Sequence, residues 1–164
     1  MKTKDEFDLA STPRGIGKAA QHFLFDATGN DNYWKEGNLP ALVTMNDESS
    51  IIVREEHHFM GNPHRSGAPA IIHRDRTSGD TTLEEWWQGG VRHRPGGKPA
   101  LQQTDPKTGV VTREEWWVDG VRHRAGRPAL IIRDHKSGQT LLKAHYKKGN
   151  LYDPSEARNP QIAP

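Results

Sequence analysis

The sequence predicts an all-β protein of tandem antiparallel β-hairpins, each about 30 residues long, forming an elongated twisted sheet with an irregular N-terminal arm. Two observations carry this prediction. Residues 84–94 return almost unchanged as residues 114–124: both begin with two Glu and two Trp and end in Arg-His-Arg, at a spacing of 30 residues. The flanking segments are rich in Val, Ile, Thr and Trp and show no helical periodicity.

The composition limits both the core and the classes of function. Only 32% of the 164 residues are hydrophobic and the mean hydropathy is -0.90, so we expect thin apolar layers. The absence of Cys excludes disulfides and thiolate chemistry, and a net charge of +2 is not that of a polycation. No apolar run reaches the roughly 18 residues of a membrane span, and the N-terminus lacks the apolar centre of a signal peptide. We therefore expect a cytoplasmic protein.

The repeated unit occurs five times between residues 22 and 152. Each copy has an apolar strand, a turn, a polar strand that ends in two aromatic or His residues, and a Gly. The pairs are Tyr33-Trp34, His57-His58, Trp86-Trp87, Trp116-Trp117 and His145-Tyr146, and their glycines are Gly37, Gly61, Gly90, Gly120 and Gly149. The first unit is short and the last has Lys143-Ala144 in place of two Glu, as expected of capping repeats.

A turn signal divides each unit into two strands. Asp105 caps the turn, Pro106 fixes φ near -65°, and Gly109 supplies the left-handed residue that closes a four-residue loop. Equivalent turns are predicted at 75–79 and 134–138, and less regular ones at 26–29 and 46–49. Five hairpins give about ten strands.

The segments outside the strands set the domain limits. Pro- and Gly-containing stretches such as 91–100 connect one hairpin to the next. Residues 1–21 are predicted to be an N-terminal arm, 22–152 the five-unit repeat domain, and 153–164 a flexible tail. The glycines of 15–18 resemble a phosphate loop only superficially, because the remaining elements of that motif are missing.

Adjacent residues of a strand point to opposite faces of a sheet, so Trp86 and Trp87 should separate, as should Trp116 and Trp117. In register, each position then forms a row across neighbouring hairpins. The candidate partner-binding residues are the Trp, Arg and His side chains of these rows: Trp86, Trp87, Arg92, His93, Arg94, Trp116, Trp117, Arg122, His123 and Arg124.

The charged rows have a functional and a structural interpretation. The His-Arg pairs at 64–65, 93–94 and 123–124 could bind phosphates or carboxylates, or could satisfy carbonyl groups at turns. The Glu pairs at 55–56, 84–85 and 114–115 could act as acid and base, but three equal copies do not suit an active site. We favour the structural interpretation of both, with ion pairs between the Glu and Arg rows.

We expect no metal, no cofactor and no catalytic residue. His57, His58, His64 and His73 are close in sequence, but their spacing does not converge on a metal ion. His57 and His58 stand where the next unit has Trp. No nucleophile with a base is evident, and most Ser and Thr lie in turns.

The Trp-x-x-Gly spacing of Trp34 to Gly37, Trp87 to Gly90 and Trp117 to Gly120, followed by His-Arg and then by Gly-x-Pro-Ala, resembles the MORN-repeat superfamily and its bacterial and phage relatives of the YwqK antitoxin-like type. The resemblance covers roughly residues 22–152. It implies successive antiparallel hairpins, and roles as scaffolds, interaction modules or, in bacteria, neutralisers of another protein.

The resulting hypothesis is a non-enzymatic protein-binding module that neutralises or inhibits a toxin or a host-defence enzyme, since Trp and Arg commonly anchor interfaces. Open sheet edges also favour a homodimer. One alternative is a single-stranded nucleic-acid binder that uses the Trp and Arg rows. The interleaved Glu residues would oppose phosphate binding. A scaffold that contacts membrane phospholipid, as the resemblance implies, is the other alternative.

Overall fold

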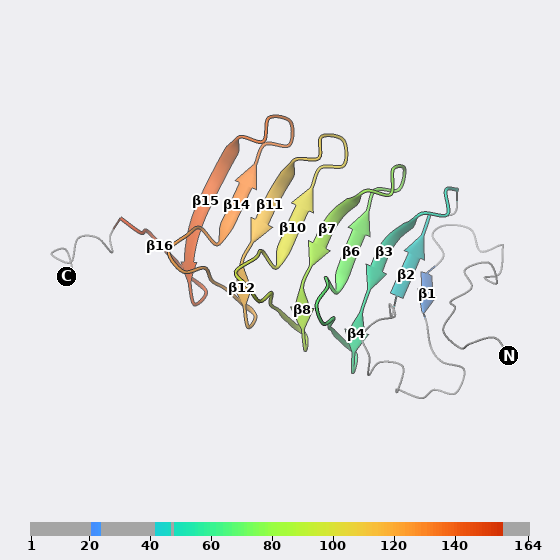
Figure 1. The fold of residues 1–164 in the computed structure, drawn as a ribbon, viewed down its shortest axis with the longest axis horizontal. Helices are drawn as coiled ribbons and strands as arrows, with labels where there is room; N and C mark the ends of the chain where they lie inside the picture. The colour runs from blue at the N-terminus through green and yellow to red at the C-terminus, as the bar shows by residue number, and fades with distance from the viewer. Residues whose placement is uncertain (1–20, 24–41, 47, 156–164) are drawn as a thin grey trace.

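The protein is one open, elongated antiparallel sheet (Figure 1), seen in a computed structural model that describes residues 21–23, 42–46 and 48–155. Ten strands follow one another across it, and their order is that of the sequence: β1 (Gln21–Phe23), β2 (Leu42–Met45), β3 (Ile52–Glu56), β6 (Ile71–Arg74), β7 (Thr81–Glu85), β10 (Leu101–Thr104), β11 (Val111–Glu115), β14 (Leu130–Arg133), β15 (Thr140–Lys147) and β16 (Asn150–Tyr152).

In the described residues, three two-stranded hairpins lie along one side of this sheet, and we call them the small hairpins. They pair β4 (His58–Phe59) with β5 (Asn62–Pro63), β8 (Trp87–Gln88) with β9 (Val91–Arg92), and β12 (Trp117–Val118) with β13 (Val121–Arg122). In Figure 1 they lie along the lower side of the sheet, whereas the turns of the long hairpins lie along the upper side.

The predicted fold is confirmed: the chain is all-β, and its tandem hairpins form one long antiparallel sheet. The described residues contain four long hairpins, β2–β3, β6–β7, β10–β11 and β14–β15. They include no helix long and apolar enough to cross a lipid bilayer.

The start of the array differs from the expected first hairpin. β1 pairs directly with β2 and runs antiparallel to it. It therefore has the direction of a second strand, because the first strands of successive units run parallel to one another. The aromatic pair, glycine and turn predicted for the first unit lie outside the described residues, as do residues 1–20 of the arm and 156–164 of the tail.

The long-hairpin turns form as their sequence predicts. The backbone N–H of Asp105 donates to the carbonyl of Val110 (2.9 Å), and Gly109 has a φ of 71°. Oδ1 of Asp105 accepts from the backbone N–H groups of Lys107 and Thr108 at 3.0 and 2.9 Å. Backbone donors of this kind hold the pKa values of Asp75, Asp105 and Asp134 below their usual range. The turn predicted at 46–49 is one residue longer, because Ser50 takes the left-handed position with a φ of 57° and its N–H donates to the carbonyl of Asn46 (2.9 Å).

Alanines join the units where one long hairpin leads into the next. The N–H of Ala100 donates to the carbonyl of Glu115 (2.7 Å), and its carbonyl accepts from the N–H of Trp86 (2.8 Å). Ala70 and Ala129 make the equivalent pairs of bonds. All three alanines are completely buried, which explains the small side chain. The apolar core is thin, as the composition predicts, and its larger members are Val43, Ile72, Leu101, Trp116 and Leu130.

The small hairpins turn through two residues with positive φ, the geometry of a type I′ turn. Asp119 and Gly120 have φ values of 48° and 76°. The N–H of Gly120 donates to the carbonyl of Arg92 in the previous unit (3.1 Å), and a Cβ on Gly120 would lie 3.4 Å from Cβ of Val91. The Gly of the Trp-x-x-Gly motif thus serves both the turn and the contact between units.

Candidate functional site

The two Trp of each pair face opposite sides of the sheet, as predicted. Nε1 of Trp87 donates to Glu85 at 2.8 Å, and Nε1 of Trp117 donates to Glu115 at 2.7 Å. Trp86 and Trp116 have different partners, since the guanidinium groups of Arg94 and Arg124 lie 3.8 and 3.6 Å from their ring centres. The candidate residues therefore form two separate groups.

The first group is an alternating stack of aromatic rings and guanidinium groups that runs across three units. Cζ of Arg92 lies 4.8 Å from the ring centre of Trp87 and 5.1 Å from that of Trp117. Cζ of Arg122 lies 4.9 Å from Trp117 and 4.8 Å from Tyr146. We call these five residues the Trp–Arg stack. Each Arg lies within cation–π distance of rings from two different units.

Glutamates fix the arginines of the stack. Nη2 of Arg92 donates to Glu85 (2.8 Å), and Nη2 of Arg122 donates to Glu115 (2.9 Å). Each of these carboxylates also accepts a bond from a Trp of its own unit, so ring and cation share one acceptor. Ion pairs were predicted between the Glu row and the arginines of the His-Arg pairs. Arg65 makes such a pair with Glu55 (3.6 Å), but in the next two units Arg92 and Arg122, two residues before Arg94 and Arg124, bind the glutamates instead.

Glu115 is the most buried member of the network, with a side chain that is 1% exposed. Arg113 also donates to it, through Nε at 2.6 Å. Burial alone would raise the pKa of Glu115, but the hydrogen bonds from Arg122, Trp117 and Arg113 outweigh burial and keep that pKa below its usual range. The charged form of this buried carboxylate is therefore favoured.

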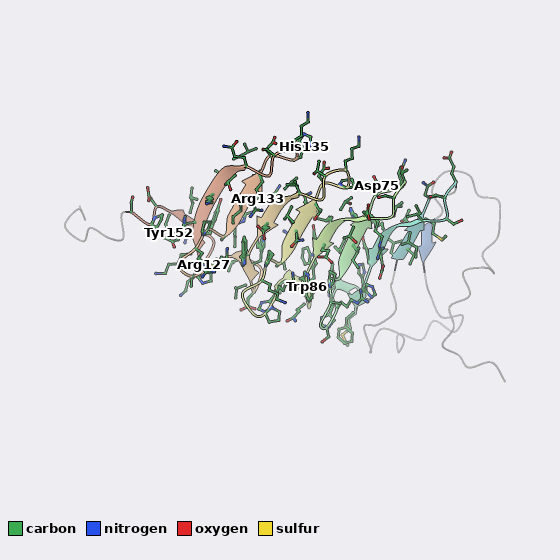
Figure 2. All side chains as sticks on the ribbon, turned by 45° about the horizontal axis from the view of Figure 1, so that its top comes forward. Asp75, Trp86, Arg127, Arg133, His135 and Tyr152 are labelled. Carbon is green, nitrogen blue, oxygen red and sulfur yellow. The ribbon has the colours of Figure 1, made fainter. Side chains whose placement is uncertain are left out.

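The second group lies on the opposite face. Arg94 and Arg124 cover Trp86 and Trp116, and their Nη1 atoms donate to the carbonyls of Pro99 (3.0 Å) and Pro128 (3.2 Å). Burial lowers the pKa of both guanidinium groups. Satisfaction of turn carbonyls is the structural role expected for these arginines. Figure 2 shows Trp86 on the side of the small hairpins, away from Asp75 and His135 at the long-hairpin turns.

Trp116 is better satisfied than Trp86. Its Nε1 donates to the carbonyl of Gly97 (2.9 Å), whereas buried Nε1 of Trp86 has no partner among the described residues. The connecting segment 91–100, which supplies Gly97, is one residue longer than its equivalents 62–70 and 121–129. The connecting segment that is one residue longer is thus the one whose carbonyl accepts a hydrogen bond from a Trp of the next unit.

The three histidines of the His-Arg pairs connect successive units. Nδ1 of His64 accepts from the N–H of Gly89 (3.0 Å), Nδ1 of His93 from that of Asp119 (3.1 Å), and Nδ1 of His123 from that of Lys148 (3.2 Å). Each bond reaches the small-hairpin turn or its equivalent in the next unit. The sequence predicts this row but does not predict that it joins units.

In the unit that has His instead of Trp, glutamates bind the imidazoles. Nε2 of His57 lies 2.8 Å from Glu55, and Nε2 of His58 lies 3.0 Å from Glu56. The contact with His57 has the largest effect on Glu55; together with the contact from Arg74 (2.9 Å) it outweighs burial and lowers the pKa of Glu55 from 4.5 to about 2. Within the described ranges, no group of three or more His, Asp or Glu side chains is arranged to hold a metal ion.

Exposed apolar side chains lie on the small hairpins, on the face opposite the Trp–Arg stack. Val91 pairs with Gln88, and Val121 pairs with Val118, next to the Trp-Arg pairs of the same hairpins. Because neighbours along a strand alternate in direction, these valines face away from the stack. Val91 and Val121 are each 42% exposed and Val118 is 37% exposed.

These valines and Tyr146 are not among the residues predicted from the sequence. The signal for the valines was Asp119-Gly120 between Val118 and Val121, a typical two-residue hairpin sequence. Tyr146 occupies the position of Trp117 one unit later, and comparison of the aromatic pairs could have added it.

A shallow groove lies near the long-hairpin turns, away from the candidate residues. His73, Gln103, Asp105, Arg133, His135 and Leu141 are among its lining residues. Burial lowers the pKa of His73, which favours the neutral ring. The groove contains none of the residues predicted for partner binding.

Comparisons with protein-family models, curated proteins and solved structures gave no significant match. Tandem hairpins in one long antiparallel sheet are therefore established from the structure, and the resemblance to MORN-type repeats remains a prediction.

Proposed function

We propose that this protein is a non-enzymatic protein-binding module whose interface is the row of small hairpins. The interface comprises the Trp–Arg stack on one face and Val91, Val118 and Val121 on the other. Neutralisation of a bound toxin or host-defence enzyme is the role that the resemblance to antitoxin-like repeats would give such a module.

The proposal rests on side chains of the kind that anchor interfaces, which are already held in place before a partner binds. Trp and Arg are the residue types that most often anchor protein interfaces. Here the half-buried Trp87 and Trp117 are held by Glu85 and Glu115, which also hold the arginines between the rings. A partner would not have to order these side chains on binding, and this reduces the entropic cost of association.

The exposed valines add apolar area that no described residue covers. Packing between units aligns them, since a Cβ on Gly120 would lie 3.4 Å from Cβ of Val91 and a Cβ on Gly149 would lie 3.9 Å from Cβ of Val121. A row of rigid apolar side chains with polar neighbours is the composition of an interface core and rim.

The same geometry weighs against a nucleic-acid partner at this row. Arg92 and Arg122 each donate to a glutamate of their own unit, so the stack offers a phosphate little net positive charge. Lys and Arg side chains free of carboxylates are what a polyanion requires.

The proposal is tested by capture of proteins from a bacterial or phage-infected lysate on the immobilised full-length chain, with identification by mass spectrometry. Val91→Asp combined with Val121→Asp places two charges at positions that are each 42% exposed, and circular dichroism checks that the sheet is retained. We expect the double variant to lose a protein that the original chain retains.

The matched control is Thr81→Asp combined with Gln139→Asp, which adds the same charge at exposed positions near the long-hairpin turns. The control should retain the protein. An identical set of retained proteins for both double variants and the original chain would refute the proposed interface.

A further inference from the structure

The charge pattern of the sheet changes sign at its C-terminal end. Glu84 and Glu114 lie in one cross-strand row with Gln102 between them, and the same row continues through Ile131 to Lys143. In two preceding units, the first strand of the next unit supplies the cation: Arg74 to Glu55 at 2.9 Å and Arg133 to Glu114 at 2.6 Å. The earlier units have a glutamate at this position, which faces the first strand of the next unit. Lys143 places a positive charge there instead.

The backbone beside Lys143 is an open strand edge. Within the array, Leu83, Glu84 and Glu85 pair with β10 of the next unit. The equivalent residues Leu142–Ala144 pair with β14 on their inner side, and β16 pairs only with His145, Tyr146 and Lys147. In the part of the chain that the structure describes, no strand pairs with the outer side of Leu142–Ala144. An open edge of this kind is a template for another strand.

Apolar side chains surround this edge. Leu141 is 65% exposed, Leu142 is 45% exposed and Leu151 is 66% exposed, whereas Leu101 and Leu130 inside the sheet are 7% and 8% exposed. Leu151 stands one unit after Arg122, at the end of the Trp–Arg stack. Tyr152 and Arg127 mark this end of the array in Figure 2.

The charge on and beside β15 is positive. Of the eight Lys and Arg in residues 120–155, Arg122 and Arg133 are paired with Glu115 and Glu114, whereas Lys143, Lys147 and Lys148 have no ion pair among the described residues. A partner that binds this end of the sheet should therefore carry negative charge as well as apolar side chains.

We propose that the outer edge of β15 at Leu142–Ala144 is a second docking site, which accepts an extended acidic segment of a partner protein as an added strand. The segment pairs with the open backbone groups, places a carboxylate beside Lys143 and carries apolar residues on either side of it. This is strand addition, in which backbone bonds supply affinity and alternate side chains supply specificity.

Two other occupants fit this edge less well. A second copy pairing through the same edge would bring like-charged Lys143 side chains together, which destabilises a cross-strand pair. A nucleic acid would use the positive charge, but it has no strand of N–H and C=O groups to pair with the edge. The combination of open backbone, leucines and lysine fits an acidic peptide.

The test measures binding of the full-length chain to two fluorescent peptides, Val-Thr-Ile-Glu-Ile-Thr-Val and the same sequence with Lys in place of Glu. Fluorescence polarisation should show the acidic peptide binding about tenfold or more tightly. Lys143→Glu should reverse this preference. Lys107→Glu makes the same change of charge at an exposed turn and should leave the preference as it was.

Methylation of the backbone nitrogens of the acidic peptide should abolish binding, and this measurement requires no change to the protein. The inference fails if both peptides bind equally or not at all, or if Lys143→Glu keeps the original preference. It also fails if ultracentrifugation shows a dimer that Lys143→Glu disrupts, or if oligothymidylate binds at Lys143 and the acidic peptide does not. None of these readouts depends on the small hairpins, so the two proposals can fail separately.

Discussion

A carboxylate shared between an indole and a guanidinium fixes each Trp and Arg of the stack. Glu115 accepts from Trp117, Arg122 and Arg113. Among the described residues Glu85 accepts only from Trp87 and Arg92, because Leu83 stands where the other unit has Arg113. The same residue type therefore supports a denser network in one unit than in the next.

Replacement of Glu115 by Gln should lower the free energy of unfolding by about 2 kcal/mol, because the partly exposed Arg122 and Arg113 lose the buried carboxylate to which they donate. Glu85→Gln should cost less, since that side chain is more exposed (14%) and has fewer donors. Urea unfolding followed by Trp fluorescence measures both values. Equal losses would show that the third donor, Arg113, contributes nothing.

The pKa of Glu55 predicts how stability responds to acid. Since the pKa falls from 4.5 to about 2 on folding, the folded protein favours the charged carboxylate, and this stabilisation is complete above pH 4.5. It is lost as the pH falls through about 2. The difference in unfolding free energy between the original chain and Glu55→Gln should accordingly shrink as the pH falls below 4.5. A difference that grows on acidification would contradict the assignment.

At the scale of the element, the small hairpins depend on glycine for geometry and for contact. Gly120 has a φ of 76° and lies against Val91 of the previous unit. Gly89 also has a positive φ, but nothing lies within 4 Å of a Cβ at that position. A substitution at Gly89 therefore tests the turn conformation alone, whereas one at Gly120 tests the turn conformation together with packing between units.

Gly120→Ala should destabilise the fold by about 1–2 kcal/mol, because alanine is strained at a φ of 76° and its Cβ would lie 3.4 Å from Val91, at the short end of ordinary contact. Gly89→Asn should stay within about 0.5 kcal/mol of the original chain, since Asn adopts this conformation readily. Chemical unfolding of both variants makes the comparison. Similar losses at the two sites would mean that the contact with Val91 does not contribute.

A feature could be predicted from the sequence when it depends on residues that lie close together in the chain. The turns at 75–79, 105–109 and 134–138 could be predicted because Asp and Gly determine them within five residues. The small hairpins escaped prediction because each strand has only two residues, and inter-unit bonds such as Gly90 N–H to the carbonyl of Pro63 (3.0 Å) support them.

The same distinction applies to the candidate site. Opposite orientation of Trp86 and Trp87 followed from strand geometry alone. The sequence did not reveal which cation meets which ring, because Arg92 reaches Trp117 only through the stacking of units. Arg74 and Arg133 were missed as glutamate partners since the equivalent position in the intervening unit is Thr104, which breaks the visible repeat.

At the scale of the whole molecule, contacts join each unit to its neighbours along one direction. Alanine bonds, histidine bonds and the Trp–Arg stack all connect one unit to the next. In such an array, stability is approximately the sum of the terms for the units and for their interfaces.

Deletion of residues 91–120 removes one period and joins Gly90 to Val121, which preserves the local sequence at the junction. The shortened chain should still fold, with a lower unfolding free energy and a smaller denaturant dependence, because less surface is buried. Circular dichroism and urea unfolding measure these quantities. A chain left unfolded by the deletion would argue for one indivisible cooperative unit.

Site-specific photo-crosslinking measures whether the row of small hairpins binds another protein. A benzophenone amino acid replaces Val121 on a small hairpin in one version of the full-length protein and Ser137 on a long-hairpin turn in another. After irradiation in lysate, our account predicts a covalent adduct with one partner protein from position 121 and none from position 137. An adduct with that partner from position 137 and none from position 121 would contradict it.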